Sequence, residues 1–233
     1  MLPLVVDEFW SCSSFATEFS FPKKVWKKTR YIPNGVDLEK FQYNEEIRKE
    51  MRNTLSLSDQ FVVGHAGRFN HQKNHDFLID IFSELHKVEP SAVLVLCGVG
   101  ELEENIKEKV YTLGLKDNVI FYGGCNEMEK MYQAWDVFVL PSKFEGLPVT
   151  GVEAQASGLP LVLSDVITKE VAVTDAVCYV SLNKSEEEWA RTILSCKGYR
   201  RNTDISTLRR AGFDQKKMVD DFQNYYLNIL KNI

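Results

Sequence analysis

Two acidic residues, Glu145 and Glu153, flank the predicted start of a helix. Before them, Val137–Leu140 are four apolar residues that predict a strand buried on both faces, and Pro148 stands where the helix would begin. The first N–H groups of a helix have no partner within it, so they form an anion site. Since an ionised carboxylate accepts two hydroxyl hydrogen bonds, the pair suits a ligand with phosphates in its middle and a diol at each end, as in a nucleotide sugar.

Two cations, Arg68 and Lys73, lie in a loop that follows the predicted strand at 61–66 and precedes a predicted helix. A diphosphate leaving group gains negative charge as its bond to a sugar breaks. Cations fixed beside it would stabilise the transition state more than the ground state. Gln72 stands where a P-loop would have its second glycine, which argues against that motif. By themselves, the two cations could equally be solvated surface charges.

Glycines follow the next two predicted strands, as Gly98-Val99-Gly100 and as Tyr122-Gly123-Gly124. A complete Gly-x-Gly-x-x-Gly would predict a dinucleotide site, but Glu103 occupies the third glycine position. We therefore reject a dehydrogenase. Glycines at strand ends are common, so these two segments carry little weight alone.

The elements that must position these residues alternate between strand and helix. We predict strands at 61–66, 92–97, 119–122, 137–140, 159–163 and 177–180, and helices at 74–88, 101–113, 127–134, 148–156, 185–194 and 215–230. Such alternation predicts an α/β fold, a doubly wound parallel sheet of Rossmann-like form covered on both faces. Ligands of these sheets bind beyond the carboxyl ends of the strands, where every motif above falls.

Composition excludes several classes of protein. The chain has 233 residues, of which 44% are hydrophobic, enough for one large or two small domains. A net charge of −5 argues against a nucleic-acid partner. No apolar run approaches the ~20 residues of a membrane span, and no signal peptide is evident. Five widely spaced cysteines without Cys-x-x-Cys predict a reduced, cytoplasmic protein, with Cys97 and Cys178 in the core and the four histidines on the surface.

The first thirty residues give weaker signals. Val5-Val6 and Phe9-Trp10 suggest a short strand, and 13–19 suggest a helix. A basic run follows, interleaved with Phe21 and Trp26 and made of Lys23, Lys24, Lys27, Lys28 and Arg30. We favour a solvated face or linker; the alternative is a peripheral contact with an anionic membrane.

The stretch Pro-Ser-x-x-Glu-Gly-Leu-Pro at 141–148, with Glu153 after it and Gly-Leu-Pro at 158–160, resembles the Glu-x7-Glu motif of the retaining GT-B glycosyltransferases of family four, glycosyl transferases group 1. The similarity covers about 31–180, and Ile-Pro-Asn-Gly-Val-Asp at 32–37 resembles the junction between the two domains of that family. It implies the C-terminal domain of a GT-B fold. Residues 1–30 would be a remnant of the acceptor domain, 31–214 the nucleotide-sugar-binding domain, and 215–233 a helix packing back toward the first domain.

The resemblance also implies roles. Glu145 would hold the transferred sugar, Arg68 and Lys73 the diphosphate, and Glu153 the ribose diol. The other expected binding residues are Gly67, Gly98, Gly100, Tyr122, Gly123, Gly146, Leu147 and Val149. The chain has no Asp-x-Asp, the metal-holding motif of the other major glycosyltransferase fold, so we expect neither a metal nor a cofactor.

The implied reaction moves a hexose from a nucleotide-diphosphate sugar, with a UDP-sugar favoured, to a saccharide or lipid-linked acceptor hydroxyl with retention. It would serve bacterial polysaccharide assembly at the inner membrane face. Two alternatives stay open: a sugar-nucleotide epimerase of the same fold, and a non-catalytic binding module. Only about thirty residues precede the junction, so we expect this chain to be inactive alone and to associate with itself or with a partner supplying the N-terminal domain.

Overall fold

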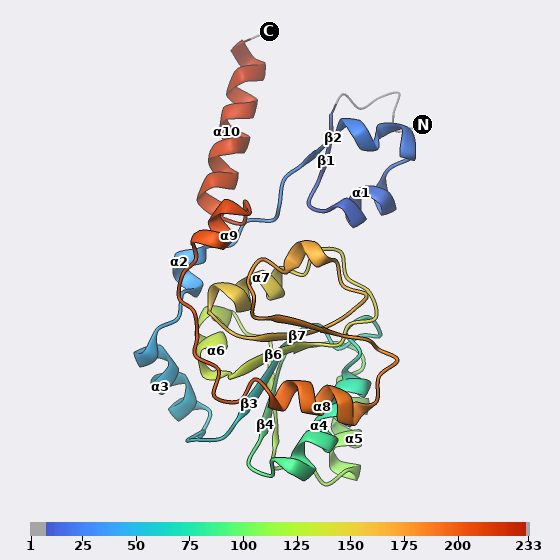
Figure 1. Ribbon diagram of the computed structural model, residues 1–233, viewed down its shortest axis with the longest axis vertical. Coiled ribbons are helices and arrows are strands. Elements are labelled where there is room, and N and C mark those ends of the chain that lie inside the picture. The colour runs from blue at the N-terminus through green and yellow to red at the C-terminus, as the bar shows by residue number, and fades with distance from the viewer. Residues whose placement is uncertain (1–7, 232–233) are drawn as a thin grey trace.

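The computed structural model describes residues 8–231 and consists of a six-stranded sheet layered between helices, a small N-terminal unit and a long C-terminal helix (Figure 1). The predicted strand at Val5-Val6 lies outside the described residues. Among residues 8–231, no helix is both long and apolar enough to cross a membrane.

The sheet is parallel throughout, as predicted. Its strands are β3 (Val62–Ala66), β4 (Val93–Cys97), β5 (Val119–Gly123), β6 (Val137–Leu140), β7 (Leu161–Ser164) and β8 (Val177–Val180). In space the order is β5-β4-β3-β6-β7-β8. The chain first builds outward from β3 to β5 and then outward from β6 to β8, so the winding reverses between β3 and β6. In open α/β sheets, the crevice at this reversal is where ligands bind.

Helices cover both faces of the sheet and create two cores. One face is covered by α4 (His75–Val88), α5 (Glu103–Thr112) and α8 (Glu186–Leu194), and the other by α3 (Glu45–Thr54), α6 (Met128–Ala134) and α7 (Val149–Ala156). Side chains alternate between the faces along each strand. In β6, for example, Val139 packs with the first group and Phe138 with the second.

Strong local signals give accurate bounds. β6 and β8 match the prediction, and α7 begins after Pro148. α7 ends before Gly158, whose φ of +67° lies in the left-handed region that favours glycine. Within residues 8–231, three α-helices were not predicted: α2 (Leu38–Phe41), α3 and α9 (Ser206–Arg210). The side chain of Asn44 caps α3 by accepting from two backbone N–H groups, but few apolar residues mark this helix.

Two predictions about burial were wrong. Cys178 is exposed because β8 is the edge strand of the sheet, whereas Cys97 is buried as predicted. His65 and His75 are also buried, at 0% and 2% exposed, because β3 is central and the first turn of α4 folds over its carboxyl end.

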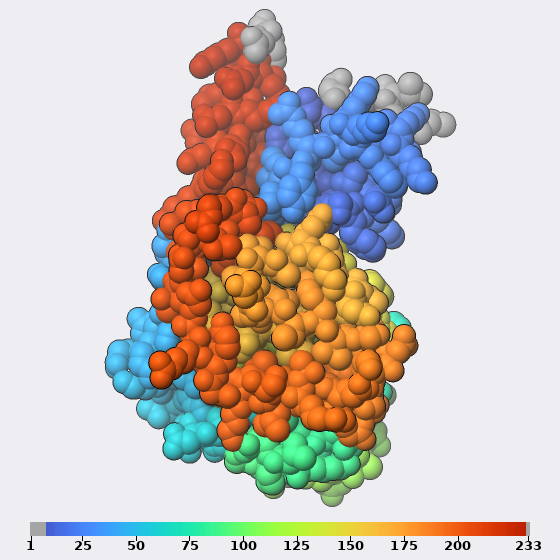
Figure 2. Space-filling model, in the orientation of Figure 1, coloured from blue at the N-terminus to red at the C-terminus, as the bar shows by residue number. Residues whose placement is uncertain are grey.

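The N-terminal unit contains β1 (Phe9–Ser11), α1 (Ser14–Ser20), the 3-10 helix η2 (Lys23–Lys28) and β2 (Thr29–Tyr31), with β1 and β2 parallel. The C-terminal helix α10 (Gln215–Lys231) lies against it, as Figure 2 shows. Trp10 stacks on Phe222 at 5.1 Å between ring centroids and meets Tyr225 edge-on at 4.6 Å. A second contact joins the unit to the 3-10 helix η3 (Lys169–Val171), where Ser14 N–H donates to Glu170 at 3.2 Å.

Candidate functional site

The loops that follow β3 and β6 meet at the carboxyl end of the sheet, where the winding reverses. Lys143 N–H donates to the carbonyl of Gln72 at 2.8 Å, and Asn74 Nδ2 donates to the carbonyl of Pro141 at 3.1 Å. The two loops are therefore tied together. We call Arg68, Lys73, Glu145 and Glu153 the carboxyl-end site.

Glu145 is buried, at 7% exposed, and is the best-connected member of this site. Its Oε1 accepts from Lys73 Nζ at 2.6 Å and from Ser142 Oγ at 2.8 Å, and its Oε2 accepts from Gln72 Nε2 at 3.1 Å. The structure thus joins Glu145 directly to Lys73. Arg68 is exposed, and within residues 8–231 its guanidinium makes no hydrogen bond or ion pair. Sequence analysis missed Ser142 and Gln72 as partners, although both adjoin the predicted motifs.

Glu153, on α7, is half-buried and has a different environment. Its Oε2 accepts from the hydroxyl of Tyr132 on α6 at 2.9 Å. Burial raises the pKa of Glu153 above its ordinary value; the hydrogen bond from Tyr132 opposes this, and repulsion by Glu129 adds to it. Tyr132 is therefore a further residue of the site region that sequence analysis did not identify.

The start of α7 separates the two carboxylates in sequence. Pro148 precedes the first helical residue, Val149, and no side chain caps the first N–H groups of the helix. Leu147 is buried, whereas Gly146 has open space beside its Cα. These are the features of an anion-binding helix start.

The predicted glycines bring the neighbouring loops into contact. A side chain on Gly98 would place its Cβ 2.0 Å from the carbonyl oxygen of Gly67, and one on Gly100 would place it 2.4 Å from that of Phe69. Gly98 N–H also donates to the carbonyl of Gly123 at 2.8 Å. The loops after β3, β4 and β5 thus lie side by side, and Tyr122, in the last of these strands, is 39% exposed at the same end.

A pair of buried histidines lies directly beneath this site. The rings of His65 and His75 meet edge-on at 4.6 Å, and Phe69 stacks on His75 at 4.1 Å. His65 Nδ1 bonds to the carbonyl of Val139 at 2.8 Å. Burial, with a smaller contribution from the nearby Lys73, lowers the pKa of His65 well below its ordinary value and that of His75 to about 4. Both rings are therefore neutral at pH 7.

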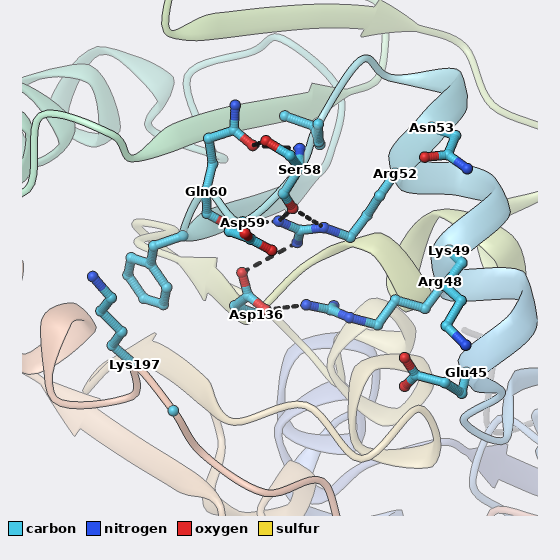
Figure 3. A pocket seen from close by; sticks show the side chains of 13 residues that line it. Glu45, Arg48, Lys49, Arg52, Asn53, Ser58, Asp59, Gln60, Asp136 and Lys197 are labelled. Carbon is cyan, nitrogen blue, oxygen red and sulfur yellow. Dashed lines mark hydrogen bonds and ion pairs between the residues drawn. The ribbon is translucent and has the colours of Figure 1, made fainter.

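A cavity of about 590 Å³ lies at the opposite end of the sheet (Figure 3). Arg48 and Arg52 of α3 reach Asp136, at 2.6 and 3.4 Å, and Asp136 also accepts from the N–H of Val62 at 2.8 Å. Arg201 donates to the carbonyl of Gln133 at 2.9 Å, to which Arg48 also donates. We call Arg48, Arg52, Arg201 and Asp136 the amino-end cluster.

Neither end offers an evident metal site. Across the part of the chain that the structure describes, no three His, Cys, Asp or Glu side chains gather as metal ligands would.

Comparisons with known proteins identify the family. Residues 46–198 match the family model described as glycosyl transferases group 1. The chain is 35% identical over 223 residues to the putative glycosyltransferase EpsF of Bacillus subtilis, covering 93% of this chain and 58% of that protein. It is 37% identical over 145 residues to the Escherichia coli UDP-Gal:alpha-D-GlcNAc-diphosphoundecaprenol alpha-1,3-galactosyltransferase, covering 60% of this chain and 37% of that one.

Solved structures share the fold. HepE from Anabaena, in complex with UDP and glucose, has a TM-score of 0.79 at 19% identity, covering 95% of this chain and 63% of that one. The C-terminal domain of LpcC, a glycosyl transferase group 1 family protein from Francisella tularensis, has a TM-score of 0.59 at 21% identity, covering 82% of this chain and 98% of that one. This chain thus has the Rossmann-like fold seen in GT-B glycosyltransferases, and it spans 58% or less of the curated relatives named above. It belongs to the glycosyl transferases group 1 family.

Proposed function

We propose that this chain is the donor-binding half of a retaining glycosyltransferase, which moves a hexose from a nucleoside diphosphate sugar to an acceptor hydroxyl. The observation that carries the proposal is the carboxyl-end site itself. A cation in contact with a buried carboxylate, Lys73 and Glu145, lies where a doubly wound sheet binds ligands, beside a helix start that no side chain caps.

Each residue then has a chemical role. Arg68 and Lys73 bind the diphosphate, with Arg68 able to contact two oxygens and Lys73 acting as a point charge. Together with the N–H groups at Leu147 and Val149, they stabilise the charge that grows on the leaving group. Glu145 accepts hydroxyl hydrogen bonds from the transferred sugar, and Glu153 accepts those of the ribose. The two cations supply the positive charge, so we propose that transfer needs no metal.

Related proteins support a uridine nucleotide and a role in polysaccharide assembly. Structures of similar fold contain UDP or UDP-glucose, and the E. coli relative is named for UDP-Gal and a diphosphoundecaprenol substrate. We propose a saccharide or lipid-linked acceptor. The exposed lysines of η2, Lys23, Lys24, Lys27 and Lys28, would suit a peripheral position at an anionic membrane face.

The test compares UDP with uridine. Replacing Lys73 or Arg68 with Met should weaken UDP binding by at least about tenfold, which corresponds to ~1.4 kcal/mol, and should change uridine binding little. Lys116→Met removes an exposed lysine from the far end of the sheet and is the matched control. Binding of UDP should weaken with added salt and be unaffected by a chelator. Equal losses for UDP and uridine would contradict the diphosphate assignment, and a clear loss with the chelator would contradict the metal-free proposal.

A further inference from the structure

Tyr132 is held rigidly inside the protein although it ends in a polar group. It lies on α6 at 0% exposed. Its ring packs against Trp135 at 4.9 Å, Phe41 at 5.8 Å and Phe138 at 5.9 Å between centroids. Aromatic neighbours on several sides leave the ring one orientation, so the position of its hydroxyl is fixed by the core.

That hydroxyl meets one side chain, the carboxylate of Glu153. It donates to Glu153 Oε2 at 2.9 Å and lies 3.2 Å from the carbonyl oxygen of Thr150. Among residues 8–231, no other hydrogen bond to the Glu153 carboxylate is present. Since a carboxylate has about four lone-pair sites, most of its accepting capacity is left for a ligand.

The backbone that carries Tyr132 is fixed from the opposite end of the sheet. Arg201 donates to the carbonyl of Tyr132 at 3.2 Å and to that of Gln133 at 2.9 Å, and Arg48 donates to the same Gln133 carbonyl at 2.9 Å. α6 is therefore anchored at its C-terminus by the amino-end cluster. A continuous set of contacts joins that cluster to Glu153 through Tyr132.

We propose that Tyr132 is a positioning residue: by holding one oxygen of Glu153, it orients the carboxylate to accept both hydroxyls of a ribose. This inference rests on the proposed function, in which Glu153 binds the ribose. Without the hydroxyl of Tyr132, the carboxylate would have to be ordered by the ligand itself, which costs binding free energy.

The experiment uses Tyr132→Phe in the full chain, a change that removes one oxygen and keeps the ring. Binding of UDP, GDP and ADP is measured by calorimetry, followed by the 2′,3′-dideoxy analogue of whichever binds most tightly. We expect the variant to bind the ribonucleotide about fivefold more weakly, as for the loss of one hydrogen bond, and to bind the dideoxy analogue as the unmodified protein does. Tyr179→Phe removes another hydroxyl that donates to a backbone carbonyl, that of Thr168, and is the matched control.

A second readout needs no ligand. The charged and titratable groups that act on Glu153 are Tyr132 and Glu129, and Glu129 is itself paired with Lys40 at 3.2 Å. Because the hydrogen bond from Tyr132 lowers the pKa of Glu153, Tyr132→Phe should raise that pKa. Carboxyl-carbon NMR titration of both proteins measures the shift in the pKa of Glu153. As the pH is lowered, Glu153 of the variant should be protonated at a higher pH, so its affinity for the ribonucleotide should begin to fall at a higher pH than in the unmodified protein.

The outcomes separate the possibilities. Equal weakening for the ribonucleotide and its dideoxy analogue would mean that Tyr132 only supports the core, and an unchanged Glu153 titration would mean that the hydrogen bond does not orient the carboxylate; either result overturns the proposal. If the unmodified protein bound none of the three diphosphates, the proposed function would fail and take this inference with it. The NMR titration would still report whether the hydrogen bond exists.

Discussion

The two ends of the sheet both place basic side chains beside a carboxylate, yet they differ in how many of their donors are used. At the amino-end cluster, Arg52 donates to the carbonyls of Ser58, Gln60 and Ala134 as well as to Asp136. At the carboxyl-end site, Lys73 has the carboxylate of Glu145, and Arg68 is exposed. The amino-end arginines use most of their donors on the protein and stabilise the fold, whereas Arg68, and Lys73 with its single carboxylate partner, keep donors for the diphosphate in the proposed function. The cavity of about 590 Å³ lies at the amino end, where the donors are already used, so cavity volume does not mark the proposed site.

Helix polarity explains the same difference. The arginines of the amino-end cluster contact carbonyls at the C-terminus of α6, where the helix dipole is negative and cations are stabilising. The carboxyl-end site instead has the N-terminus of α7, where the dipole is positive and an anion is favoured. Cations at a helix C-terminus stabilise the folded protein, because they offset the negative end of the helix dipole. Cations beside an uncapped N-terminus add to its positive potential, which favours binding of an anionic ligand.

The largest effect should follow from breaking the amino-end cluster. Arg52→Met leaves three carbonyls without this donor and removes one of the cations on Asp136. Asp136 keeps Arg48, so the loss comes mainly from the buried carbonyls left without a donor, at about 1–3 kcal/mol each, and we expect the free energy of unfolding to fall by about 3–5 kcal/mol. Urea denaturation measures this change. Lys49→Met, which removes an exposed lysine of the same helix, should cost less than about 0.5 kcal/mol. If the folded Arg52→Met variant kept its stability but bound UDP more weakly, the amino end would be the ligand site, and our assignment of the two ends would be wrong.

Lowering the pH should reduce the stability of the protein through His75, which lies at the carboxyl end of the sheet. Its pKa of about 4 is below the ordinary 6.5, so the unfolded chain binds more protons between these values. The stability contributed by the neutral ring is present above about pH 6.5 and is lost as pH falls toward 4. This term amounts to about 2 kcal/mol between pH 7 and pH 5. His75→Phe, which can keep the stack on Phe69, should show a shallower fall in urea denaturation. Identical pH dependence in both proteins would contradict the buried, neutral state of His75.

Glu153→Ala tests the ribose contact directly. In the proposed function, the substitution removes two charge-assisted hydrogen bonds to the ribose, each worth roughly 1.5–3 kcal/mol. Binding of UDP should therefore weaken by at least about tenfold in calorimetry. Glu127→Ala, an exposed acid just before α6, is the control. Unchanged affinity in Glu153→Ala would place the ribose elsewhere.

The smallest effect we expect runs in the opposite direction. Glu145→Gln removes the negative charge paired with Lys73, so the repulsion of a bound diphosphate falls and UDP should bind roughly fivefold more tightly. Any gain in affinity that the sugar of UDP-glucose provides should shrink, because a neutral amide accepts hydroxyl hydrogen bonds more weakly than a carboxylate does. Glu101→Gln serves as the exposed control. Weaker UDP binding would mean that Lys73 needs Glu145 to hold its position.

Much of the fold follows from local sequence, because β6 lies between clear stop signals and α7 lies between Pro148 and Gly158. The order of the strands and the meeting of Lys73 with Glu145 agree with general rules for doubly wound sheets. The remaining features depend on contacts between distant segments. The sequence around Tyr132 does not predict its hydrogen bond to Glu153, and the sequence around His65 does not predict its contact with the ring of His75.

The glycines at 98 and 100 carry a consequence for protein engineering. Each allows the loop after β4 to touch the backbone of the loop after β3, with no space for even a methyl group. The two loops therefore pack as one unit, and the loop after β3 carries Arg68. Exchanging one loop for that of a homologue with another nucleotide preference would displace its neighbour as well. A successful graft would have to transplant both loops together.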